Sequence, residues 1–372
     1  MNRKYYIDNI RILLTALVVL HHLAITYAGG PGLWYYVEPN SNPITNLILT
    51  LFVATNQSFF MGMFFLISAY FLEKSLRRKS ANQVVRDKLK RLGIPLLFYI
   101  LILSPVIMYL KVRYQFDMEL SVAEFFRTQQ WLTFGPIWFV AALLLFTLVT
   151  VIGGQFIKLP FLRTTAPLPS NRRIILGVLF ITLISFIVRI KIPVGETLDP
   201  FGFQLAHFTQ YIVLFCVGFV ASRNNWLDQI SPADAKLWMR AVWVFLVLLF
   251  PAVFYFGGAL TNGVDIFMGG LTWQSFAYSL WEEVVGIGII IGLFSWYREK
   301  RNTQSALQKN LSASAYTVYI FHSLILVALS LAIRNVAISP TTKFVILAPI
   351  VLISCFAISN GIRKLPIARN IL

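Results

Sequence analysis

Ten apolar stretches, each long enough to cross a lipid bilayer, constrain the fold of this chain more than any other feature. They cover approximately residues 10–28, 45–72, 94–112, 136–152, 174–190, 208–222, 239–257, 275–296, 313–333 and 343–360. Of the 372 residues, 58% are hydrophobic and only 13% are charged, a composition unlike that of a soluble domain. The sequence therefore predicts an all-α, polytopic integral membrane protein with about ten transmembrane helices, organised as a single membrane domain over residues 1–372.

The basic residues are distributed unevenly between the connections of these segments. When successive connections are assigned to alternate sides, 25 of the 32 Lys and Arg residues lie on the side of both termini, among them Lys158 and Arg163. Because Lys and Arg accumulate in cytoplasmic loops, we expect both termini in the cytoplasm. The same bias accounts for the net charge of +17 without a nucleic-acid partner.

The first segment carries Arg11 near one end and the pair His21 and His22 deep inside. An α-helix turns about 100° and rises about 1.5 Å per residue, so Arg11 and His22 share a face and lie about 16 Å apart, whereas His21 lies about 80° off that face. A histidine near the middle of a bilayer is energetically costly and indicates a function. Two structural alternatives remain open: His22 bonds to a neighbouring helix, and Arg11 only anchors the helix end at the membrane surface.

Two later segments also place titratable groups inside the predicted membrane. His322 falls in the layer of the first-segment histidines and Tyr319 lies one turn before it, while Glu282 and Glu283 lie about 10–12 Å below the outer surface. A pairing of the two glutamates with a buried Arg or a hydroxyl is the structural alternative to catalysis. His207 lies near the outer interface, where we expect a surface or substrate-groove residue.

The second segment and the connection after it carry unusual polar groups. The segment spans about 28 residues and contains the polar run 55–58 (TNQS), which predicts a tilted or broken helix. The connection carries Arg86, Lys88 and Arg91, and the last two are three residues apart on an expected short helix, so that they converge on one anion. This cluster predicts a phosphate site, although anionic lipid headgroups are the simpler alternative.

Several kinds of site are excluded. Cys216 and Cys355 lie inside apolar runs, so neither a disulfide framework nor a metal site is expected. No Walker loop, Rossmann glycine fingerprint or HExxH motif occurs. A GxSxG nucleophile elbow is also missing.

Five sequence elements together resemble those of the membrane-bound acyltransferase-3 family, and they follow in the same order over most of the chain. The elements are Arg11 with His22 (R-x10-H in the family), residues 64–70 (FFLISAY, resembling FFxxSGY), 88–95 (KLKRLGIP, resembling RxxRL), 135–139 (GPIWF, resembling GPxWF) and 314–322 (SAYTVYIFH, resembling SxxxYxxH). Ala69 replaces the usual Gly and Lys88 the first Arg. The sequences of residues 6–11 (YIDNIR) and 90–95 (KRLGIP) look closest to those of the glucan-modifying branch, whose typical member succinylates periplasmic glucans.

This resemblance implies a multi-pass enzyme of the bacterial cytoplasmic (inner) membrane, with no metal cofactor. It implies transfer of an acetyl or succinyl group from acyl-coenzyme A (acyl-CoA), bound on the cytoplasmic side, to a hydroxyl of a cell-envelope glycan. It implies that His22 is the general base and that Glu282 or His322 orients His22 or the acceptor. The residues implied in donor binding are Lys88, Arg91, Arg86 and Arg11. Those implied in substrate contact are Trp138, Tyr319 and Ser68. Trp138 alternatively serves as an interfacial anchor, and His22 alternatively forms a transient acyl-histidine.

A transporter or flippase of glycans or acyl donors is the main alternative function. Midplane histidines and a broken second segment also suit a transport site. No matched pair of repeats is visible in the sequence, which argues against this alternative. The identity of the acyl group, the glycan acceptor and the oligomeric state are left open.

Overall fold

The computed structural model describes residues 3–28, 34–128, 131–156 and 165–371, which contain ten helices long and apolar enough to cross a membrane. These spans are Tyr5–Tyr27 (α1), Pro43–Leu76 (α2), Ala81–Tyr114 (α3 Ala81–Lys88, α4 Ile94–Phe98 and α5 Ser104–Tyr114), Gly135–Phe156 (with α7, Trp138–Phe156), Asn171–Arg189 (α8), Leu205–Asn224 (with α9, Phe208–Asn224), Pro232–Phe256 (α11 Pro232–Trp243 and α12 Phe250–Phe256), Trp273–Lys300 (α15), Ala306–Ala332 (α16) and Pro340–Ile362 (α17). The predicted all-α polytopic fold is confirmed. Lys158 and Arg163, counted in the charge bias, lie outside the described residues.

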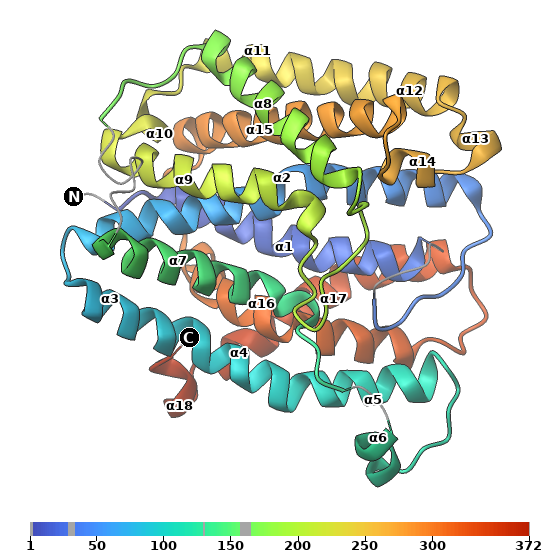
Figure 1. The fold of residues 1–372 in the computed structure, drawn as a ribbon. Helices are drawn as coiled ribbons and strands as arrows, with labels where there is room; N and C mark the ends of the chain where they lie inside the picture. The colour runs from blue at the N-terminus through green and yellow to red at the C-terminus, as the bar shows by residue number, and fades with distance from the viewer. Residues whose placement is uncertain (1–2, 29–33, 129–130, 157–164, 372) are drawn as a thin grey trace.

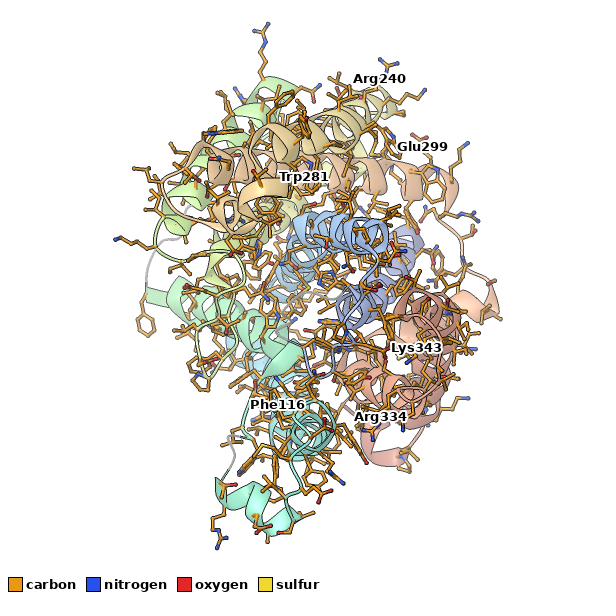
Figure 2. The ribbon with its side chains drawn as sticks, turned by 90° about the vertical axis from the view of Figure 1, so that its right-hand side faces the viewer. Phe116, Arg240, Trp281, Glu299, Arg334 and Lys343 are labelled. Carbon is orange, nitrogen blue, oxygen red and sulfur yellow. The ribbon has the colours of Figure 1, made fainter. Side chains whose placement is uncertain are left out.

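The ten spans run side by side, with both chain ends toward one side of the molecule (Figure 1). Arg3 and Arg369, from the two ends of the chain, line a common pocket there, and we call this the terminal side. The opposite side, here called the loop side, carries α6 (Val122–Thr128), α13 (Ala259–Asn262) and α14 (Asp265–Met268). Figure 2 looks onto the loop side, where Lys343 donates to the backbone oxygen of Arg334 over 2.8 Å. The cytoplasmic placement of the terminal side stays a prediction.

Helix α2 packs closely against its neighbours. A Cβ atom added to Gly218 of α9 would lie 2.1 Å from the backbone oxygen of Leu66, and one added to Gly286 of α15 would lie 2.0 Å from that of Ser58. Within a membrane, helices associate through such close backbone approach because the lipid offers no hydrophobic driving force. These two glycines therefore hold α9 and α15 against α2.

The second segment is predicted to be tilted or broken; the break is wrong, and the tilt stays a prediction. Helix α2 runs without interruption for 34 residues, about 51 Å, which exceeds the bilayer core of about 30 Å. The polar run at 55–58 bonds locally or to neighbouring helices: Gln57 Nε2 donates to Tyr211 Oη over 2.9 Å, and Ser58 Oγ donates to Thr55 O over 2.7 Å. Gln57 and Ser58 thus find partners without any opening of the backbone, whereas the buried Nδ2 of Asn56 has no hydrogen-bond partner among the described residues.

Three π-helical turns occur within the described spans, and each ends two residues before a proline. They are Leu89–Gly93, Tyr99–Leu103 and Val244–Leu249, before Pro95, Pro105 and Pro251. Proline lacks an N–H and crowds the carbonyl four residues earlier, which a wider turn relieves. Before Pro95 that carbonyl belongs to Arg91, and it accepts a hydrogen bond of 2.9 Å from Tyr316 Oη. The third span is thereby tied to α16.

Candidate active site

Two cavities lie at opposite ends of α1. The larger has a volume of about 980 Å3 and is bordered by the loop-side halves of α1, α2 and α5 and by parts of segments 132–138 and 194–207. We call it the loop cavity. The smaller, of about 300 Å3, lies at the terminal side and is lined by five arginines. We call it the arginine pocket. Among the described residues the two cavities share no lining residue.

His22 lines the loop cavity and contacts a second histidine from a distant part of the chain. Its Nδ1 lies 3.2 Å from Nε2 of His322 on α16, and the ring centroids are 5.0 Å apart. His322 is fully buried, whereas His22 is partly exposed. The prediction that the two histidines share a layer is confirmed by this contact.

The hydrogen bonds decide which ring nitrogens carry protons in the neutral pair. Nδ1 of His322 lies 2.7 Å from Tyr319 O, and because a carbonyl only accepts, this Nδ1 carries the proton and Nε2 of His322 is an acceptor. Nδ1 of His22 faces that acceptor and also Val18 O, 2.9 Å away, so it carries the ring proton. The nitrogen left unprotonated is Nε2 of His22, in a side chain that borders the loop cavity.

Trp34 covers His22 from one side. The two rings stack with centroids 4.2 Å apart and an interplanar angle of 23°, and Trp34 also lines the loop cavity. The neighbouring His21 also borders the loop cavity; its ring packs on Phe60 of α2, with centroids 4.9 Å apart, and meets the His22 ring edge-on at 5.4 Å. Sequence reasoning did not find Trp34, because a stacking partner outside the helices leaves no periodic pattern.

Two predicted substrate residues also line the loop cavity. Trp138, at the start of α7, stacks on Tyr211 with ring centroids 5.8 Å apart. Tyr319 donates its hydroxyl to the backbone oxygen of Pro136. In the same wall, burial raises the pKa of Tyr35 well above its usual value, so its hydroxyl stays protonated. The wall therefore offers aromatic faces and neutral polar groups.

The arginine pocket brings together cations from three separate parts of the chain. Its arginines are Arg3, Arg11, Arg91, Arg363 and Arg369, and its one carboxylate is Asp8. Asp8 accepts from Arg3 Nε over 2.9 Å and from Arg11 over 3.5 Å. Five guanidinium groups facing one carboxylate leave an excess of positive charge that suits a polyanion such as a phosphate ester.

Not every predicted donor residue reaches this pocket. Arg11 and Arg91 line it, whereas Lys88 and the exposed Arg86 do not. The π-helical turn Leu89–Gly93 begins directly after Lys88 and contains Arg91, so it changes the angular spacing that the prediction assumed for a regular helix. Ser68, predicted to contact substrate, is half-buried on α2 and lines neither the loop cavity nor the arginine pocket.

Glu282 and Glu283 belong to a separate buried network. Arg189 at the end of α8 is fully buried and donates to Glu282, whose other oxygen lies 2.8 Å from Nδ1 of His207. Glu283 accepts from Gln210 Nε2 over 2.9 Å. The described contacts of both glutamates stay within this network and do not include His22. An arginine at the end of an apolar run, as Arg189 is in α8, is itself a sign of a buried pair.

No metal site is apparent in the parts of the chain that the structure describes, since no three His, Cys, Asp or Glu side chains come together there. The fold and the two cavities thus define a polytopic membrane protein with a histidine pair at the wall of a large cavity and an arginine-lined pocket at the other end of α1. A family model described as an acyltransferase domain, that of the acyltransferase-3 family, matches residues 4–360. The chain belongs to this family and is a membrane acyltransferase, as the resemblance implied.

Two curated relatives of this chain share one name. Over 333 residues the chain is 24% identical to glucans biosynthesis protein C of Salmonella gallinarum (strain 287/91 / NCTC 13346), covering 86% of this chain and 81% of that protein. Over 153 residues it is 29% identical to glucans biosynthesis protein C of Escherichia coli (strain SMS-3-5 / SECEC), covering 40% and 38%. No solved structure matches the chain. The family match favours the enzyme over the transporter or flippase that the sequence had left open.

Proposed function

We propose that this acyltransferase moves an acetyl or succinyl group from acyl-CoA to a hydroxyl of a cell-envelope glucan, with His22 as general base. The observation that carries the proposal is the unprotonated Nε2 of His22 at the loop cavity, on the same helix as Arg11 of the arginine pocket. The glucan acceptor is inferred from relatives named glucans biosynthesis protein C. The protein then lies in the bacterial inner membrane with its terminal side facing the cytoplasm, where acyl-CoA is available.

The donor is proposed to bind with its phosphates in the arginine pocket. Guanidinium groups bind phosphate oxygens through paired, charge-assisted hydrogen bonds, and acyl-CoA carries several phosphates. Arg11 and His22 are eleven residues apart on α1, about 16 Å along the helix. The long arm of the donor would follow α1 and bring its thioester toward His22.

Two tyrosines separate the two cavities on this path. Tyr316 lines the arginine pocket and Tyr319 the loop cavity, one turn apart on α16. Each hydroxyl is held by a backbone oxygen of another segment, that of Arg91 and that of Pro136. The donor arm requires this pair of side chains, or their neighbours, to move aside before the thioester reaches His22.

Transfer itself would be general-base catalysis at His22. The acceptor oxygen attacks the thioester carbonyl carbon while its proton passes to Nε2 of His22. The tetrahedral intermediate collapses with cleavage of the C–S bond, and the proton held by His22 passes to the leaving thiolate. While His22 is charged, its Nδ1–H is shared by His322 and Val18 O, and the face of Trp34 stabilises the cation.

The test is thiol release by purified protein supplied with acetyl-CoA or succinyl-CoA and a gluco-oligosaccharide, together with mass spectrometry of the sugar. We expect His22→Ala to lower the rate by about 10²- to 10⁴-fold, the usual contribution of a general base. His21→Gln is the matched control and should lose much less, because the described hydrogen bonds of His22 go to His322 and Val18 and not to His21. Wild-type rates in the His22 variant, or equal losses in both variants, would refute the assignment.

A further inference from the structure

The network around Arg189 contains one polar atom that the proposed mechanism does not use. Nε2 of His207 is buried and has no hydrogen-bond partner among the described residues, although buried polar atoms are nearly always paired. His207 is 3% exposed, and it is one of the residues that border the loop cavity. The other ring nitrogen of His207 is held by the network.

The contacts of His207 determine its tautomer. Nδ1 lies 2.8 Å from a carboxylate oxygen of Glu282, and an unprotonated Nδ1 would set two lone pairs against each other. Nδ1 therefore carries the proton. A second proton on Nε2 would create a buried cation beside the guanidinium of Arg189, 3.3 Å away, while Glu282 is already paired with that guanidinium. Nε2 of His207 is accordingly a hydrogen-bond acceptor.

The network is built to hold this ring in place. Arg189 donates through Nε to Ala206 O over 3.2 Å and through a terminal nitrogen to Ser279 Oγ over 3.0 Å, in addition to Glu282. Buried charges in a membrane are costly and usually serve a function. Here they hold an imidazole in the wall of the loop cavity, and one of its nitrogens is left without a hydrogen-bond partner among the described residues.

We propose that His207 forms a second subsite of the loop cavity and accepts a hydrogen bond from a hydroxyl of the acceptor sugar that is not the reacting one. This inference rests on the proposed function. Sugar hydroxyls donate hydrogen bonds and sugar rings stack on aromatic faces, and Trp138 and Tyr278 border the same cavity. His22 would then act on one hydroxyl while His207 selects the orientation of the sugar, with Glu282 and Arg189 as positioning residues.

The first test uses His207→Asn, whose side-chain amide can still donate to Glu282 but lacks the acceptor at the Nε2 position. Loss of one neutral hydrogen bond predicts a rise in KM for a gluco-oligosaccharide of roughly 3- to 10-fold, with kcat and the KM for acetyl-CoA within about two-fold of wild type. Glu283→Gln is the matched control. It is a buried neighbour whose amide can keep the contacts to Gln210 and Ser185, and it should leave the acceptor KM unchanged.

An unchanged acceptor KM in His207→Asn would overturn the inference, and so would a proportional loss of kcat and donor affinity, which marks a merely structural role. If that variant does not fold, the structure of the wild-type protein with the gluco-oligosaccharide bound decides. A sugar oxygen within hydrogen-bond distance of His207 Nε2 supports the subsite, and a bound sugar that leaves this atom unpaired overturns it. Failure of the wild type to bind or acylate the oligosaccharide would overturn the proposed function together with the inference.

Discussion

Removal of a single charge from the arginine pocket separates donor binding from chemistry. Arg91→Gln removes a guanidinium that lines the pocket, but it keeps the hydrogen bond from Tyr316, because Tyr316 binds the backbone oxygen of Arg91. A charge-assisted hydrogen bond contributes about 1.5–3 kcal/mol, and each 1.4 kcal/mol corresponds to a tenfold change in affinity. We therefore expect the KM for acetyl-CoA to rise about 10- to 150-fold, with kcat at saturating donor little changed.

Lys90→Gln is the matched control for this experiment. Lys90 precedes Arg91 in the same π-helical turn and is exposed, and it is not among the residues that line the pocket. Its loss removes the same charge at a solvated site, so we expect less than about a two-fold change in donor KM. The assay is thiol release at varied acetyl-CoA, repeated with acetyl-pantetheine, which has no phosphates. Equal KM shifts in both variants, or an Arg91 penalty that persists with acetyl-pantetheine, would refute phosphate binding in the arginine pocket.

Two further predictions test the histidine pair and the helix packing. His322→Leu should lower kcat roughly 10- to 100-fold, the usual loss when the partner that orients a metal-bound histidine is removed. His322→Gln offers an amide oxygen to Nδ1 of His22 and should recover part of this loss. Equal rates in the two variants would contradict an orienting role for His322. Gly218→Ala should destabilise the protein by about 1–3 kcal/mol or more, because the new Cβ would meet the backbone of α2. Gly177→Ala is the control: a Cβ added there meets no atom within 4 Å, so this change should be neutral or slightly stabilising. Thermal unfolding in detergent measures the stability of both variants, and equal melting temperatures would contradict the packing argument.

The number of spans and the layer of the two histidines could be predicted from sequence for a simple reason. Helices that cross a bilayer must satisfy every backbone hydrogen bond internally, so each appears as an apolar run of nearly fixed length. Depth along such a helix follows from counting residues, which placed His22 and His322 at the same level before any contact was known. Family membership could be predicted from the five motif elements, because each element is a short stretch of the chain that is visible in the sequence alone.

Contacts between helices were decided only by the tertiary structure, because apolar periodicity does not say which helices are neighbours. Glu282 pairs with Arg189 and His207 rather than with His22, and Arg363 and Arg369 join Arg11 although more than 350 residues separate them. The polar run in α2 suggests a break or a tilt in the sequence, because Tyr211, the partner of Gln57, lies on another helix. Chain-local chemistry thus determined the helices and their depth, whereas close packing of distant segments determined the two cavities, the tautomer of His22 and the buried network behind His207.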